Sequence, residues 1–328
     1  MTVEAASEVA PATRPMGNRA SRFRDYGIVL ALIVIVLALW LSTSTFMTSG
    51  NLINVLDQCS VLGLLAIGAT VCILSGVFDL TASATLALST MLGMQVMRQT
   101  NLAVGFTATL LFGALLGLIT GTIVVRSGVN SFIATLAASI VYRGLAVVVT
   151  SGAIIYPLAS QTTDFGMLTW PSLFSLTSAT VVFVIVAVVV SVVVAASTFG
   201  RRLYAVGGNA EAARLSGIRI GSIHVTAYVI SGLCSALAGL ILASRAGSAN
   251  SSMATGMELT AIAAAVIGGT SIMGGEGAAW RGVVGALILT LIGNGFNLLG
   301  WNTTYQQVVE GCLILVAVAV DRWLRKRQ

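Results

Sequence analysis

The chain has 328 residues, of which 57% are hydrophobic and 9% are charged, and its formal net charge is +6. A soluble globular domain carries about a quarter charged residues, so this composition excludes an ordinary soluble protein. The positive charges lie mostly beside long apolar runs, which argues against nucleic-acid binding and for a membrane protein.

Apolar runs of nearly bilayer length predict an all-α, polytopic membrane protein with about ten transmembrane helices. The runs are too long and too little alternating for the strands of a membrane barrel. Residues 1–26 are expected to form a disordered cytoplasmic tail, and the run after them lacks the A-x-A cleavage site of a signal peptide. The expected spans are 27–47, 57–75, 80–97, 102–125, 131–150, 178–197, 223–244, 258–273, 282–299 and 305–321.

An even number of spans places both termini on the same side of the membrane. If that side is the cytoplasm, the cytoplasmic segments, with the basic tail 322–328, hold fourteen of the seventeen Lys and Arg residues. Such an excess of positive charge marks the cytoplasmic loops of membrane proteins. The N- and C-termini are therefore predicted to be cytoplasmic.

A glycine-interrupted joint separates the second and third expected spans. It contains Gly76, Phe78 and Asp79, so the two helices are expected to meet at a break or a bend. Asp79 is most simply an N-cap of the third span, where the helix dipole favours its charge. The alternative is a direct role of Asp79 in transport or gating.

The fourth and fifth spans carry packing and charge signals. Gly113, Gly117 and Gly121 recur every four residues, the pattern that lets membrane helices approach closely. Arg143 lies well inside the fifth span, so it should face protein or water, with Glu310 as a candidate partner and a purely structural ion pair as the simplest outcome. The long loop 151–177 suits either docking of an external partner or a lid.

The loop 200–218 is the longest polar interruption in the second half of the chain, and it contains a short helix signal. Asn209 is a good N-cap, Glu211 and Arg214 match the two ends of the helix dipole, and Gly217 suits a left-handed stop. A helix this short buries little by itself. Either it lies on the bilayer, or another protein receives it.

The eighth span runs from Glu258 into a glycine-rich exit that ends at Gly277 and contains Thr270 and Ser271. Residues 259–266 share five of eight positions with residues 64–71 of the second span, by chance or through an internal repeat. Paired interrupted helices in the two halves of a transporter indicate a transport pathway at their interface.

Two of these segments resemble those of a known family. The run Gly207-Gly208-Asn209-Ala210-Glu211-Ala212-Ala213, followed by Ser216-Gly217, is similar to the coupling helix of ribose/galactoside-type ABC importer permeases. The run 258–277 is similar to a second motif of that family, and the resemblance covers roughly residues 50–320. The chain departs from the family pattern at Val77, Phe78, Asn130, Thr260 and Glu276.

The resemblance implies a transmembrane permease domain, 27–321, in the bacterial inner membrane, which moves a monosaccharide or similar small polar solute by alternating access. It implies three protein partners: an ABC ATPase subunit, a periplasmic substrate-binding protein and a second permease subunit, identical or paralogous. The residues expected to couple to the ATPase are Gly207, Gly208, Asn209, Ala210, Glu211, Ala212, Ala213, Arg214, Ser216 and Gly217. The residues expected to line or gate the pathway are Asp79, Phe78, Ser131, Phe132, Thr135, Thr270, Ser271, Asn294 and Asn297.

Motifs for energy coupling or catalysis are missing from the sequence. It has no G-x-x-x-x-G-K-[ST] phosphate loop, so we expect no cofactor in this chain and ATP on the partner subunit. The single histidine, His224, has no triad or zinc-ligand spacing, and the four cysteines read as small apolar residues. The alternatives are an ion-coupled secondary carrier, a membrane enzyme, or a permease of the same family for a nucleoside, a polyol or an autoinducer.

Overall fold

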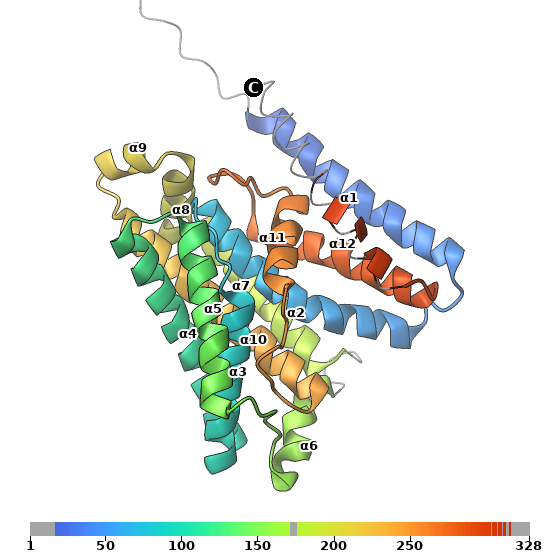
Figure 1. Ribbon diagram of the computed structural model, residues 1–328. Helices are drawn as coiled ribbons and strands as arrows, with labels where there is room; N and C mark the ends of the chain where they lie inside the picture. The colour runs from blue at the N-terminus through green and yellow to red at the C-terminus, as the bar shows by residue number, and fades with distance from the viewer. Residues whose placement is uncertain are drawn as a thin grey trace, which may run out of the picture.

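The computed structural model describes residues 17–170, 176–302, 304–306, 308–309, 311–312 and 315, with side chains from residue 27 onward. Within these ranges the regular secondary structure is helical, apart from one isolated β-bridge between Ile155 and Ala249 (Figure 1). The bounds of the elements are α1 (Gly17–Ser42), α2 (Ser49–Leu74), α3 (Ala82–Gln99), α4 (Leu102–Ser127), α5 (Ser131–Thr150), η1 (Ala159–Gln161), α6 (Thr162–Phe165), η2 (Gly166–Thr169), α7 (Ser178–Ala196), α8 (Thr198–Gly208), α9 (Ala210–Leu215), α10 (Ile220–Ala246), α11 (Met257–Ile267) and α12 (Ala279–Leu298).

The predicted all-helical membrane architecture is confirmed in its coarse form. Within the described ranges, six helices are long and apolar enough to cross a membrane: α2, α4, α5, α7, α10 and α12. α11 and the apolar part of α1 are shorter, and α3 carries buried hydroxyl groups such as those of Ser83 and Ser89. Most of the tenth expected span, 305–321, lies outside the described residues, so the count of ten remains a prediction.

α11 is shorter than the sequence predicts. The expected span 258–273 is a helix only as far as Ile267. Beyond it, Gly269, Gly274, Gly275 and Gly277 take positive φ angles, which only glycine adopts at little cost. The chain therefore leaves the helix at Gly268 and forms an irregular segment, 268–278, before α12 begins.

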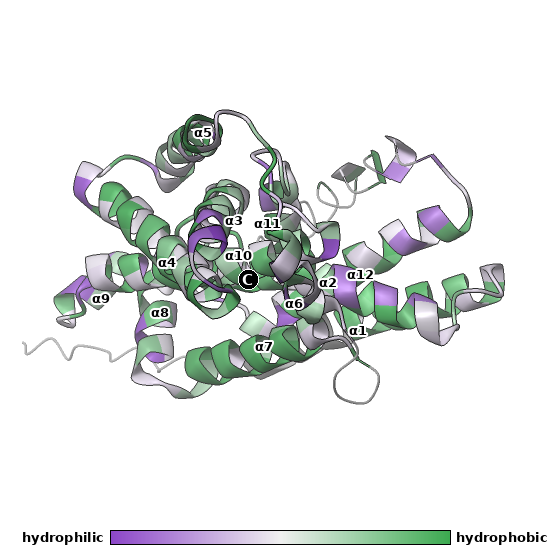
Figure 2. Cartoon of the chain, turned by 90° about the horizontal axis from the view of Figure 1, so that it is seen from below, coloured by the Kyte–Doolittle hydropathy of each residue, from purple (hydrophilic) through white to green (hydrophobic). Residues whose placement is uncertain are grey.

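The centre of the bundle is formed by α2, α3 and α10. In α2, 89% of the apolar window is buried inside the protein, compared with 22% in α7. Figure 2 shows α3 and α10 enclosed by other helices, with hydrophobic residues on α4, α5 and α7 at the periphery. Exposed apolar residues on peripheral helices are what a lipid environment requires, because lipid is itself apolar.

Close packing of α4 on α10 confirms the role predicted for the glycine series in the fourth span. A Cβ atom built at Gly117 would lie 2.3 Å from the carbonyl oxygen of Tyr228. One built at Gly232 would lie 2.2 Å from the carbonyl oxygen of Gly113. The two backbones therefore touch, as small residues at membrane-helix interfaces allow.

α8 and α9 lie at one end of the bundle, and α6 lies at the opposite end (Figure 1). The helices η1, α6 and η2 fall within the loop 151–177, which is thus partly helical. Phe165 is buried there, and its carbonyl oxygen accepts a hydrogen bond of 2.6 Å from the Ser244 hydroxyl of α10. This part of the loop is therefore packed against the bundle.

Arg143 of α5 is held by partners that the sequence did not indicate, while its suggested partner Glu310 lies outside the described residues. The guanidinium donates to the carbonyl oxygens of Ser251 and Met253, at 2.8 and 3.2 Å, and to the Ser83 hydroxyl at 2.9 Å. Ser83 in turn donates to the Glu258 carboxylate. Arg143 thus ties α5 to α3 and to the segment before α11.

Candidate coupling helix and helix joints

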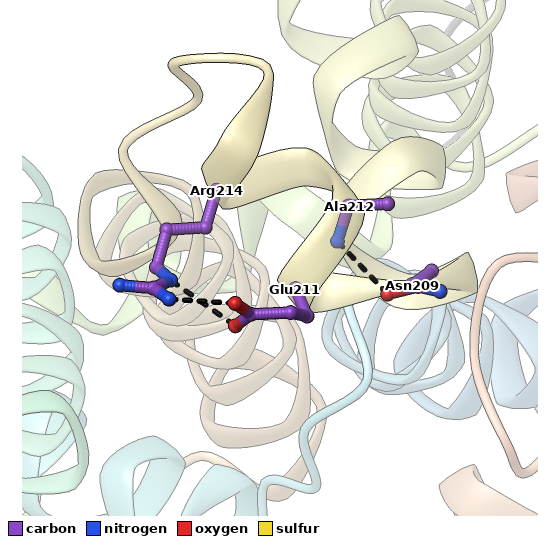
Figure 3. Close-up of polar contacts among 4 residues, drawn as sticks. All are labelled: Asn209, Glu211, Ala212 and Arg214. Atoms are coloured by element: carbon purple, nitrogen blue, oxygen red, sulfur yellow. Dashed lines mark hydrogen bonds and ion pairs between the residues drawn. The ribbon is translucent and has the colours of Figure 1, made fainter.

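α9 is a short helix whose ends are fixed by its own sequence, as predicted. The Asn209 side chain accepts a hydrogen bond of 2.9 Å from the backbone N–H of Ala212, which makes Asn209 the N-cap (Figure 3). Arg214 and Glu211 form an ion pair of 2.6 Å on the exposed surface, and the Glu211 carboxylate raises the pKa of Arg214. Gly217, at φ +80°, provides the predicted left-handed stop.

α9 buries one of its six side chains and exposes the others. Ala213 is 4% exposed and belongs to an apolar cluster with Leu74 of α2 and Tyr228 of α10. Leu215, by contrast, is 78% exposed. The remaining residues of the predicted coupling set that follow Gly207 are exposed as well: Gly208, Asn209, Ala210, Glu211, Ala212, Arg214, Ser216 and Gly217.

Beside α9 lies an open cavity of about 520 Å³. It is lined by the end of the α9 loop and the first turn of α10, and Arg202 of α8 and Arg219 give it a basic character. Both arginines are exposed. The surface around α9 therefore combines an exposed leucine with positive charge.

Two interrupted helices meet beside the last turn of α8. The first interruption, called here the first joint, is residues 75–81 between α2 and α3, and the second joint is residues 268–278 between α11 and α12. The N–H of Gly275 in the second joint donates a hydrogen bond of 3.1 Å to the carbonyl oxygen of Leu74, at the start of the first joint. The two joints are thus linked by their backbones.

The first joint is held by side chains from α5 and α10. The N–H of Phe78 donates to the Ser131 hydroxyl at 3.1 Å, and the Tyr228 hydroxyl donates to the carbonyl oxygen of Phe78 at 2.7 Å. His224 Nε2 lies 3.1 Å from the carbonyl oxygen of Ser75. The predicted pathway residues Phe78 and Ser131 are therefore in contact, although they are far apart in sequence.

Asp79 is 3% exposed, and it does not occupy the N-cap position of α3, which is Thr81. One Asp79 oxygen accepts from the N–H and the hydroxyl of Thr81, at 2.8 and 2.5 Å. The other accepts from the Ser231 hydroxyl of α10 at 2.6 Å. Asp79 thus connects the first joint to α10, and the simplest sequence interpretation, a plain N-cap, is corrected in that respect.

The second joint contains Thr270 and Ser271, both buried. The N–H of Ser271 donates to the carbonyl oxygen of Glu276 at 2.9 Å, which closes the segment into a compact loop. The Tyr204 hydroxyl of α8 donates to the carbonyl oxygen of Gly277 at 2.9 Å. Burial raises the pKa of Tyr204, and nearby Arg281 partly opposes that shift.

The remaining predicted pathway residues do not gather at the joints. Phe132 is 45% exposed on α5, and the Thr135 hydroxyl bonds back to the carbonyl oxygen of Ser131. Asn294 is buried in a reciprocal amide pair with Asn51, with N···O distances of 2.8 and 3.2 Å, and Asn297 is exposed. Asn294 and Asn297 lie about 22 Å or more along α12 from the second joint, at 1.5 Å per residue. Their role in transport stays a prediction.

Sequence reasoning missed two residues that hold the first joint, Tyr228 and Ser231. Both lie in the seventh expected span, where small and apolar residues carry no periodic signal that would mark an inward face.

Among the described residues, no group of three or more His, Cys, Asp or Glu side chains could hold a metal ion.

Comparison with known proteins assigns the chain to a family. Residues 51–318 match the family model described as the permease component of the branched-chain amino acid transport system. The chain therefore belongs to this family of transport permeases.

Three curated relatives match over nearly the whole chain. The ribose import permease proteins of Escherichia coli (strain K12) and Bacillus subtilis (strain 168) are 37% and 39% identical, over 89% and 90% of this chain and 92% of each relative. The D-allose transport system permease protein of Escherichia coli (strain K12) is 35% identical, over 94% of this chain and 95% of its own length. No solved structure gives a significant match.

Proposed function

We propose that this chain is the membrane permease subunit of an ATP-driven importer for a monosaccharide. The observation that carries the proposal is the similarity, over about nine tenths of the chain, to permeases named for ribose and allose import. The family description itself names branched-chain amino acids. The relatives' names favour a sugar instead, because they match nearly full-length and share more than a third of their residues with this chain.

The structural feature that supports a separate ATPase subunit is α9. This helix buries only Ala213 and exposes Leu215, so packing within the chain gives little reason for its presence. A groove on a partner subunit would supply the missing contacts. We propose that an ABC ATPase receives α9, binds and hydrolyses ATP, and drives alternating access without any covalent step on the solute.

The same proposal implies an orientation of the helix bundle in the membrane. The α8–α9 end then faces the cytoplasm of a bacterium, and the opposite end, with α6, faces a periplasmic binding protein that delivers the sugar. A second permease copy or paralogue completes the pathway within the inner membrane. Both termini are proposed to be cytoplasmic, in agreement with the excess of Arg and Lys in the segments on that side.

Reconstitution of the chain with its ATPase and binding protein in proteoliposomes tests the proposal. Uptake of radiolabelled D-ribose and D-allose should require ATP inside the vesicle and the binding protein outside. Uptake driven by an ion gradient without the ATPase would instead establish a secondary carrier. Wild-type assemblies that hydrolyse ATP but accumulate neither sugar would overturn the proposed solute class.

A charge placed on α9 tests the docking step. Ala212→Arg changes an exposed residue, so the fold should survive while co-purification of the ATPase and uptake both fall. Ala205→Arg, which adds the same charge to the exposed surface of α8, is the matched control for charge. Normal uptake by Ala212→Arg would contradict the assignment of α9.

A further inference from the structure

The last turn of α8 touches both helix joints through backbone atoms. A Cβ atom built at Gly207 would lie 1.9 Å from the carbonyl oxygen of Leu74 and 2.6 Å from the backbone nitrogen of Gly275. One built at Gly274 would lie 2.9 Å from the carbonyl oxygen of Gly207 and 3.0 Å from Cα of Gly76. Residue 207 therefore has no space for any side chain, and it lies between the two joints.

Two hydrogen bonds make this contact a single unit. The backbone bond from Gly275 to Leu74 links the two joints to each other, and the bond from Tyr204 to Gly277 links α8 to the second joint. No side chain separates Gly207 from either joint, so a displacement of α8 cannot be absorbed by a change of rotamer. Closely packed interiors transmit such strain rather than absorb it.

The neighbouring glycine has a different environment. A Cβ atom built at Gly208 would meet nothing within 4 Å, and Gly208 is exposed. α9 begins two residues later, at Ala210, and the N–H of Asn209 still bonds to the carbonyl oxygen of Ala205 in α8. α9 is therefore attached to α8 within one turn of Gly207.

We infer that Gly207 is the positioning residue through which a movement of α9 is transmitted to the second joint, with the first joint packed against it on the other side. Gly208 also approaches Gly275 through its backbone, but the side on which it would carry a Cβ is open, so a small side chain there leaves the contact intact. The second joint is able to respond because Gly274, a glycine at positive φ, lies at the contact and tolerates a wide range of backbone angles. This inference rests on the proposed function, since it needs an ATPase that moves α9.

Thiol labelling at the second joint tests the inference without knowledge of the solute. Met273 is 74% exposed, so Met273→Cys in a Cys312→Ser background reports the state of that joint, while Cys59, Cys72 and Cys234 are buried. The complex of permease and ATPase in nanodiscs is labelled with a maleimide, with and without ATP and vanadate. As a second readout, which does need the solute, D-ribose uptake per ATP hydrolysed is measured on the same variants in proteoliposomes with the binding protein.

Gly207→Ala is expected to keep the ATPase bound but to reduce the nucleotide-dependent change in labelling rate, and uptake per ATP, roughly tenfold or more. Gly208→Ala is expected to alter at most the affinity for the ATPase. Gly50→Ala, in open space on α2, is the general control for a glycine substitution in a helix. A response of Gly207→Ala equal to wild type, or an equal loss in Gly208→Ala, would overturn the inference.

Gly207→Ala can also fail to fold, because its Cβ would clash with backbone atoms. In that case Tyr204→Phe decides: it removes only the bond to Gly277, and it should lower the labelling response severalfold while thermal stability is largely retained. A wild-type response in Tyr204→Phe would then refute the inference. Absence of any ATP-dependent response or uptake in the wild-type complex would instead refute the proposed function.

Discussion

The two helix joints lie in contact but are held in different ways. The first joint is fixed by side chains from two other helices: Ser131 of α5, and Tyr228 and Ser231 of α10. In the second joint, five of the eleven residues are glycine, and four of these are at positive φ. The buried Thr270 hydroxyl has no hydrogen-bond partner among the described residues.

This difference suggests a division of roles. A segment whose polar groups are bonded to two other helices resists displacement, because each broken bond leaves a buried polar group without a partner. A glycine segment can change its backbone angles at low cost. We expect the first joint to act as the fixed reference and the second joint to move when α9 is displaced.

Removal of the Asp79 carboxylate should give the largest loss of stability. Asp79→Ala leaves the Ser231 hydroxyl and both donors of Thr81 buried without an acceptor, so we expect a loss of about 3 kcal/mol or more, since each buried unsatisfied group costs about 1–3 kcal/mol. Thermal denaturation in detergent measures it. Ser231→Ala, which keeps both Thr81 bonds, should lose clearly less. Equal midpoints for Asp79→Ala and wild type would show that the first joint is not pinned by this carboxylate.

A side chain in the second joint should affect coupling more than stability. Gly275→Ala forces a residue at φ +71° to carry a Cβ, 2.5 Å from Cα of Gly208. The left-handed backbone alone costs roughly 1–2 kcal/mol for such a residue. Because the segment can shift, we expect a moderate fall in the melting temperature but a several-fold loss of uptake per ATP. If the variant loses stability while its remaining folded fraction transports normally, the second joint is not the moving part.

How far the sequence anticipated these regions depends on whether the signal is local. α9 was predictable because its cap, its ion pair and its terminal glycine all lie within nine residues, and the glycine-rich joints were evident as interruptions. The partners of the first joint were not. In a membrane helix such as α10, lipid-facing and protein-facing residues are both apolar, so hydrophobic periodicity does not mark the inward face.

The predicted end of α11 was wrong for a related reason. After Glu258, the run 259–273 is continuously apolar or small, and composition alone did not separate the helix up to Ile267 from the glycine segment that follows it. The contact of Gly207 with both joints was equally hidden, because it joins three segments that are distant in sequence through backbone atoms. Only the three-dimensional arrangement distinguishes the inward Gly207 from the outward Gly208.

A smaller effect is expected from the phenol that holds the first joint. Tyr228→Phe leaves the carbonyl oxygen of Phe78 without its 2.7 Å donor and should cost about 1 kcal/mol of stability. Ser131→Ala removes the hydroxyl that accepts a hydrogen bond from the N–H of Phe78. Because both side chains hold one residue, the double variant should show an interaction energy in a double-mutant cycle. Strictly additive losses would mean that the two contacts act independently.

The smallest change in global stability should come from the cap of α9, although its local effect is specific. Asn209→Ala removes the acceptor for the N–H of Ala212, and loss of an N-cap costs about 1 kcal/mol of helix stability. α9 is exposed apart from Ala213, so the melting temperature of the permease should hardly change, while hydrogen exchange of the amides at 210–215 should accelerate. Asn209→Asp keeps a capping oxygen and should restore protection. A frayed α9 would transmit its displacement poorly. Asn209→Ala should therefore weaken the nucleotide-dependent labelling response of the second joint, while hydrogen exchange at the first joint stays unchanged. If exchange accelerates at both joints instead, the first joint is no fixed reference, and the contrast between the two joints is wrong.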